Sequence, residues 1–310
     1  MIVSCGEALI DFVPMQGVDG QAGYRPCEGG SPLNIAVGLG RLGTPVGFLG
    51  KISTDFFGDM LVGHLDRNKV DTGLVVRGPE NTTLGFVSLS DADSEPQYAF
   101  VATGAADRTI TQADLPETLP DAVSALQFGS ISLVQEPGAG AYEALMRRES
   151  GRRVMVLDPN IRPGLIADRD AYVARMEGWI AMMDLVRASV VDIEWLYPGE
   201  SIDAVAARWR ALGASVVIVT LGAEGARAWA QNGEALAVGP PVVVADTVGA
   251  GDSFFSGSLS WLHGNGHLSR DGLAAIEIGA LETALGFGCR CATITCSRPG
   301  ADPPWAEEVA

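Results

Sequence analysis

A run of small and acidic residues between positions 246 and 254 has the composition of a phosphoryl-transfer turn. It reads Asp-Thr-Val-Gly-Ala-Gly-Asp-Ser-Phe. Gly249 and Gly251 allow the backbone to turn tightly and bring its N–H groups close to a ligand. If a helix begins near Ala250, its unpaired N–H donors and the positive end of its dipole suit a phosphate. Asp252 then lies in the first turn, where its carboxylate can accept a proton from an attacking hydroxyl.

Two elements must position this turn. The apolar run Val242-Val243-Val244 predicts a strand before it, and a helical pattern follows it. Glycines and an aspartate also occur in ordinary turns with an aspartate N-cap, so this run alone leaves both interpretations open.

A second glycine run stands before a well-signalled helix. Ser31 is expected as its N-cap and Pro32 as its first residue. Gly29 and Gly30 would allow a ligand to approach the backbone closely. Asn34, one turn into the helix, offers a donor and an acceptor to vicinal hydroxyls, although a solvated helix residue is the other interpretation.

The first hundred residues also predict strands. Residues 2–5 read as a buried strand and residues 8–13 as an extended piece that carries Asp11, either an edge charge or a ligand for hydroxyl groups. Residues 83–90 and 97–103 predict a hairpin around the polar turn 91–94. We expect this hairpin to belong to a lid, with an ordinary edge hairpin as the alternative.

From Ala125 onward, apolar strands alternate with helical patterns, which predicts a parallel sheet covered by helices. Ligands bind such sheets at the carboxyl ends of the strands. The run Asp158-Pro159-Asn160-Ile161-Arg162 follows one strand, and Arg162 carries forked donors that suit a substrate, or alternatively a salt bridge.

The composition of the chain excludes several classes of binding partner. The chain has 310 residues, 47% hydrophobic and 19% charged, with a formal net charge of −17. A broadly anionic protein is not expected to bind nucleic acid or an acidic membrane. Five cysteines without paired spacing and no signal-peptide pattern predict a reduced, cytoplasmic protein. Three scattered histidines do not predict a zinc site.

The chain resembles the ribokinase/PfkB carbohydrate kinase family, and its fructokinase-like members in particular. The resemblance covers nearly the whole chain and rests on the motifs G-E-x-L-I-D, G-G-x-x-x-N-x-A, D-P-N-x-R, T-x-G-x-x-G and D-T-x-G-A-G-D-x-F. It implies a single ribokinase-like domain over residues 1–310, with a mostly parallel sheet between helical layers. A small β-sheet lid would be formed by segments near 9–28 and 83–104.

The resemblance also implies the site. Asp252 would be the catalytic base, and the Gly249, Ala250 and Gly251 amides would form the anion hole. The sugar would be held by Asp11, Gly29, Gly30, Asn34, Phe100 and Arg162. ATP would be bound by Asn160, Ser189, Asp192, Thr220, Gly222, Gly225 and Cys289. Asp246, Val248 and Gly300 would surround the monovalent cation, K⁺, that several members hold.

One departure concerns magnesium. Val190 and Val191 stand where the family usually has acidic residues that organise the Mg²⁺ water shell, which leaves Asp192 alone. The resemblance implies an ATP-dependent sugar kinase that acts on a primary hydroxyl, with a homodimer formed through the lid. A non-catalytic nucleotide- or sugar-binding sensor on the same fold is the alternative of a different class.

The sugar itself is predicted to be fructose first. 2-Keto-3-deoxygluconate is second, because Arg25, Arg108 and Arg162 could pair with a carboxylate. Val101 also replaces a tyrosine that fructokinases often have in this lid strand.

Overall fold

The computed structural model describes residues 1–17, 20–87 and 98–309. Its main sheet has eight strands, of which six neighbouring strands run parallel and the last two at one edge are antiparallel. In spatial order the strands are β14 (Gly233–Ala237), β13 (Ala226–Ala230), β12 (Val216–Thr220), β11 (Leu185–Ser189), β10 (Val154–Asp158), β9 (Ala125–Gly129), β1 (Ile2–Cys5) and β4 (Val46–Leu49).

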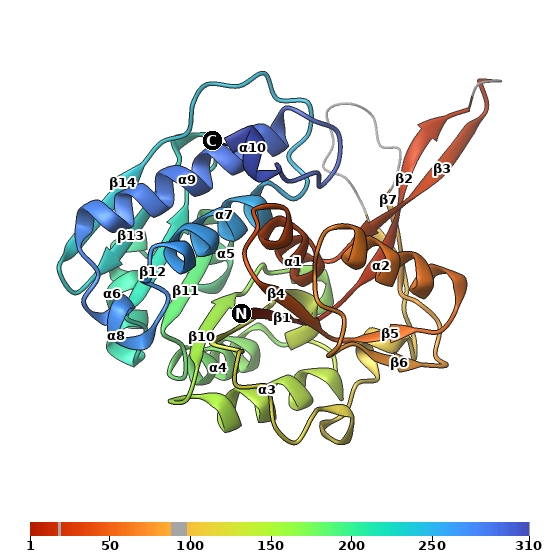
Figure 1. The fold of residues 1–310 in the computed structure, drawn as a ribbon, viewed down its shortest axis with the longest axis horizontal. Helices are drawn as coiled ribbons and strands as arrows, with labels where there is room; N and C mark the ends of the chain where they lie inside the picture. Colours follow the sequence, from red (N-terminus) through yellow and green to blue (C-terminus); the bar gives the residue numbers. More distant parts are fainter. Residues whose placement is uncertain (18–19, 88–97, 310) are drawn as a thin grey trace.

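Helices cover both faces of this sheet (Figure 1). In chain order the α-helices are α1 (Ser31–Arg41), α2 (Phe56–Arg67), α3 (Gly138–Glu149), α4 (Arg169–Ile180), α5 (Val190–Leu196), α6 (Ile202–Leu212), α7 (Ala250–Gly264), α8 (Arg270–Ala274), α9 (Ile278–Cys296) and α10 (Ala306–Val309). Alternate strand residues point to opposite faces, so Ile2 packs under α1, α7 and α9 while Val3 packs over α3, α4 and α6. Two apolar cores result.

A second, four-stranded sheet stands apart from the main one. Its order is β3 (Ala22–Gly29), β2 (Leu9–Gln16), β7 (Leu84–Val87) and β8 (Tyr98–Val101). The β2–β3 hairpin projects away from the body of the molecule (Figure 1). A short parallel pair, β5 (Lys51–Ser53) and β6 (Val76–Gly78), lies below it. The predicted polar turn at 91–94 lies outside the described residues.

Two local predictions are wrong. Residues 242–244 form no strand, since Val243 is 91% exposed on a loop that the preceding Pro240 and Pro241 deprive of backbone donors. Ser31 is not an N-cap either. Gly30 takes that place, so α1 begins at Ser31 and Pro32 is its second rather than its first residue. The Ser31 N–H donates to Glu7 Oε1 at 3.3 Å, and the Ser31 hydroxyl, which is not used as a cap, bonds another partner.

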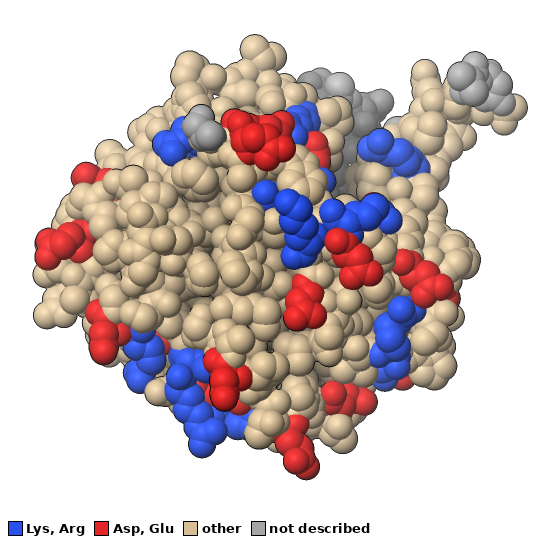
Figure 2. Space-filling model, in the orientation of Figure 1, with Lys and Arg blue, Asp and Glu red and all other residues tan. Residues whose placement is uncertain are grey.

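The surface carries both signs of charge. Figure 2 shows Lys and Arg in several small groups beside Asp and Glu on one face of the molecule. In the described part of the chain, no helix is long and apolar enough to cross a membrane.

Candidate active site

The glycine turn forms as predicted and opens α7. Gly249 has φ 72°, a left-handed conformation that disfavours other residues, and α7 begins at Ala250. Asp252 lies in the first turn and is only 8% exposed. The first backbone N–H groups of this fifteen-residue helix therefore lie beside a buried carboxylate.

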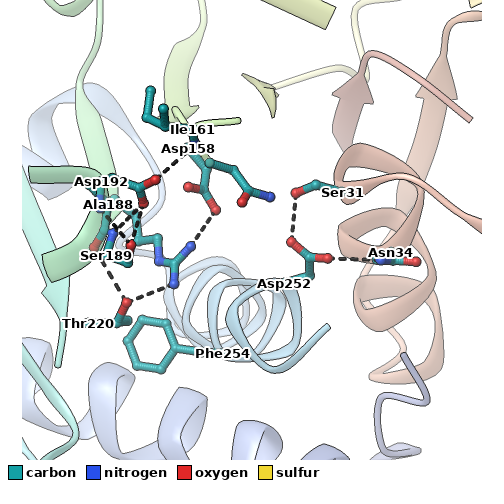
Figure 3. A network of polar contacts seen from close by, with 12 residues as sticks. Ser31, Asn34, Asp158, Ile161, Ala188, Ser189, Asp192, Thr220, Asp252 and Phe254 are labelled. Atoms are coloured by element: carbon teal, nitrogen blue, oxygen red, sulfur yellow. Dashed lines mark hydrogen bonds and ion pairs between the residues drawn. The ribbon is translucent and has the colours of Figure 1, made fainter. Parts of the chain in front are cut away.

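Two donors from α1 hold the Asp252 carboxylate (Figure 3). Ser31 Oγ donates to Oδ1 at 2.6 Å, and Asn34 Nδ2 donates to Oδ2 at 2.9 Å. Burial raises the pKa of Asp252, whereas these two bonds and the charges of Arg187 and Arg162 lower it. The two glycine-rich motifs, 221 residues apart at Ser31 and Asp252, thus meet at one carboxylate.

Asp11 lies in β2 between two glycines on neighbouring strands. A Cβ added to Gly29 or to Gly85 would come within 2.5 Å of a carboxylate oxygen of Asp11, and the Phe100 ring borders Gly85. Burial raises the pKa of Asp11 to about 6, against the opposing charge of Arg162. The glycines leave this carboxylate open to a ligand, and Gly85 was missed because a lone strand glycine carries no spacing signal.

The predicted run after β10 divides into exposed and buried parts. Arg162 is exposed, and its Nη1 donates to Asn160 Oδ1 at 2.7 Å. Asn160 has φ 42°, so it holds a tight turn at the carboxyl edge of the sheet. The charge of Arg162 lowers the pKa of both Asp11 and Asp252, which places it near both carboxylates.

A buried ion pair beneath the turn was also missed by the sequence reasoning. Arg187 Nη1 donates to Asp158 Oδ2 at 2.8 Å, and Nη2 donates to Thr220 Oγ1 at 2.8 Å. Burial raises the pKa of Asp158 to about 7; Arg187 lowers it, while Asp192 and Asp252 raise it. The signal that could have found this pair is a charge inside an apolar strand, which must be partnered when buried.

Asp192 forms a capping box with Ser189 at the start of α5. Its Oδ2 accepts the Ser189 N–H and hydroxyl, and its Oδ1 accepts the Ile161 N–H at 2.8 Å. Val190 and Val191, 40% and 73% exposed, supply no oxygen ligand. Within the described residues no cluster of three or more His, Cys, Asp or Glu could hold a metal ion. Asp192 Oδ1 fits a magnesium-bound water better than the ion itself, because direct ligation would disturb these bonds.

The remaining residues predicted to bind the nucleotide lie in and after β12 and in α9. Gly222 and Gly225 have positive φ values, 62° and 91°, in the turn after β12 that begins beyond Thr220. Cys289 is buried in α9, where its thiol contacts Ala237 O at 3.7 Å and contributes to the core. Burial raises the pKa of Cys289 to about 11.

The three residues of the predicted cation loop lie together. Asp246 Oδ1 accepts the Val248 N–H at 3.0 Å, and Oδ2 accepts the Gly300 N–H at 2.8 Å. A Cβ on Gly249 would lie 2.6 Å from the Ala301 Cβ, so the chain end packs directly on the glycine turn. Asp246 therefore links the two loops that hold the turn.

This arrangement can abstract a proton and bind an anion. Asp252 is a buried carboxylate in the first turn of α7, and Asp11 is a second carboxylate in the small sheet; the charge of Arg162 lowers the pKa of both. A hydroxyl group held by Asp11 and delivered to Asp252 would face an anion held by the turn.

Known proteins share this sequence and this fold. A family model described as pfkB family carbohydrate kinase matches residues 1–308. A fructokinase of Rhizobium leguminosarum bv. trifolii is 41% identical over 282 residues, which make up 91% of this chain and 86% of that protein.

Solved structures agree. A fructokinase with bound ATP from Xylella fastidiosa has a TM-score of 0.89 at 26% identity, covering 99% of this chain and 96% of that one. A fructokinase from Vibrio cholerae O395 in a fructose-, ADP- and calcium-bound form has a TM-score of 0.82 at 25% identity, covering 97% and 94%. The predicted α/β fold with a separate small sheet is confirmed by these neighbours.

Proposed function

Because this chain belongs to the pfkB family of carbohydrate kinases and has the ribokinase-like fold, we propose that it is an ATP-dependent fructokinase. It is a sugar phosphotransferase, and the γ-phosphate would pass to a primary hydroxyl of fructose. The observation that carries this proposal is the buried Asp252 carboxylate at the start of α7, oriented by Ser31 and Asn34. Relatives named fructokinase and a neighbour with bound fructose support the choice of sugar.

In the proposed mechanism the sugar lies between the small sheet and the glycine turn. Asp11 accepts hydrogen bonds from its hydroxyls beside Gly29 and Phe100, and Asn34 lies next to the reacting hydroxyl. Asp252 accepts the proton of that hydroxyl as the oxygen attacks the γ-phosphorus. The amides of the turn, Gly249, Ala250 and Gly251, stabilise the charge on the phosphoryl oxygens.

The small sheet would act as a lid that excludes water from the reacting phosphate. Mg²⁺, when bound to ATP, would neutralise phosphate charge and be reached by Asp192 through water. Thr220, Gly222 and Gly225 would follow the nucleotide, with Asn160 and Arg162 on the phosphate side. A lid-mediated homodimer and a cytoplasmic location stay predictions.

A test of the sugar compares fructose with 2-keto-3-deoxygluconate by coupled ADP release. We expect kcat/KM for fructose to exceed that for the acid, with little change in Arg25→Ala, because Arg25 is exposed in β3. Arg162→Ala should weaken turnover of both, since its charge acts on Asp11 and Asp252. Undetectable fructose turnover would overturn the proposal, and sugar binding without ADP release would favour a sensor.

Ser31 gives a prediction about pH. Its hydroxyl donates to Asp252 and favours the ionised carboxylate, so Ser31→Ala should raise the pKa of the base. The acidic limb of the kcat profile then moves to higher pH, while kcat above the limb changes little. Ser31→Thr, which keeps the hydroxyl, is the matched control. An unshifted limb in Ser31→Ala would show that this bond does not control the base.

The Asp246 loop predicts activation by K⁺. A cation held by this loop would fix Gly300 and Val248 and, through Ala301, the glycine turn. We expect turnover in KCl to exceed turnover in NaCl or choline chloride by roughly an order of magnitude at equal ionic strength, as electrostatic preorganisation contributes about that much or more. Equal rates in the three salts would remove the cation from the mechanism.

A further inference from the structure

Arg187 is a buried cation at the centre of the carboxyl edge of the sheet. It lies in β11, is 5% exposed, and is bonded to Asp158 of β10 and Thr220 of β12, the two strands that flank β11. Charged side chains are rarely buried without a partner, and this one has partners on both neighbouring strands. Its guanidinium is therefore held rigidly.

The guanidinium also contacts the glycine turn. A Cβ added to Gly251 would lie 2.8 Å from Nη2 and 3.2 Å from Nη1 of Arg187. A side chain at position 251 would collide with the cation, so glycine there lets the first turn of α7 lie directly against a fixed positive charge. The Arg187 guanidinium thus lies against Gly251, one of the three residues predicted to form the anion hole.

Three carboxylates act on Arg187, yet its ion pair with Asp158 leaves two polar atoms without a partner among the described residues. Burial alone would lower the pKa of Arg187, but Asp158, Asp192 and Asp252 together keep it raised. In the described part of the chain, Arg187 Nε and Asp158 Oδ1 are buried without a hydrogen-bond partner. Each of the two groups therefore has hydrogen-bonding capacity left for a further partner.

We propose that Arg187 is the fixed cation of the phosphate site, placed against Gly251 to stabilise the transferred phosphoryl group; this rests on the proposed kinase function. The transition state of phosphoryl transfer spreads negative charge over the phosphoryl oxygens. A preorganised cation in a water-poor site stabilises that charge without reorganisation. Asp158 and Thr220 position the guanidinium.

The test distinguishes two roles of the Arg187 charge: stabilising the phosphoryl group, or only neutralising Asp158. The double variant Arg187→Gln/Asp158→Asn replaces the ion pair by two neutral amides that can still bond each other and Thr220. We expect thermal unfolding near that of the wild type, an unchanged fructose KM, and a kcat lowered roughly tenfold to a hundredfold. Arg187→Lys, which keeps the charge but not the fork, should recover part of kcat.

Two outcomes would contradict the proposal. Wild-type kcat in a folded double variant would show that Arg187 only compensates Asp158, while the kinase function would stand because the wild type is active. A wild type that releases no ADP with any sugar would overturn both. Should the double variant fail to fold, a comparison of the single variants Arg187→Lys and Arg187→Gln decides: if both bind fructose and kcat of Arg187→Lys is no higher than that of Arg187→Gln, the role of the charge is contradicted.

Discussion

Replacing Asp252 by asparagine is expected to lower kcat by roughly two to four decades, the usual contribution of a general base. The amide has the shape of the carboxylate, so its oxygen can accept from Asn34 and its NH₂ can donate to the Ser31 hydroxyl. The variant therefore keeps the packing of the first turn of α7 but cannot take the proton. Initial-rate kinetics with fructose and ATP give kcat and both KM values.

The control for this variant is Asp271→Asn. Asp271 is likewise an aspartate in the first turn of a helix, α8, but it is exposed. Its replacement should leave kcat unchanged. Calorimetry with an ATP analogue should give similar affinities for the wild type and Asp252→Asn. Turnover of Asp252→Asn near that of the wild type would contradict the base assignment.

Most of the main sheet could be predicted from sequence because its strands are unbroken apolar runs. The strand predicted at residues 2–5 has the observed bounds of β1, and the alternation predicted from Ala125 onward begins with β9 at that residue and continues through β10, β11 and β12. Burial on both faces requires such runs, and the glycines and polar residues that follow mark where each strand ends.

The valine run at 242–244 shows the limit of that argument. Apolar β-branched residues favour a strand only where a neighbouring strand offers backbone partners, and this loop has none within the described residues. The residue pattern shows which side chains favour a strand. Whether a strand forms also depends on a neighbouring backbone segment with which it can pair, and only the fold determines that.

Several individual site residues could be predicted from the sequence, but the contacts between them could not. Asp252, Asn34 and Asp11 could be singled out from residue type and position, whereas the bonds from α1 to Asp252 join segments far apart in the chain. Arg187 was missed for a related reason. A lone arginine in a strand has no periodic signature, and its meaning depends on Asp158 and Gly251, which only the fold brings to it.

The sugar site gives the second large effect. Asp11→Ala should raise the fructose KM by about a hundredfold or more while leaving the ATP KM nearly unchanged, since each hydrogen bond to a charged group contributes about 1.5–3 kcal/mol and two hydroxyls can reach one carboxylate. Gly29 and Gly85 leave both carboxylate oxygens unobstructed, so the loss falls on a ligand rather than on the packing of the sheet. Initial rates at varied fructose and saturating ATP measure it.

The pH dependence of this KM provides an independent check. Burial raises the pKa of Asp11 to about 6, so the carboxylate is protonated as the pH falls through that value and accepts fewer hydrogen bonds. The wild-type fructose KM should therefore rise below pH 6, and Asp11→Asn should show a high KM with little dependence on pH. Asp59→Ala, an exposed aspartate on α2 paired only with Arg77 among the described residues, is the matched control. An equal rise of the fructose and ATP KM values in Asp11→Ala would indicate a misfolded small sheet and contradict the assignment of Asp11 to the sugar.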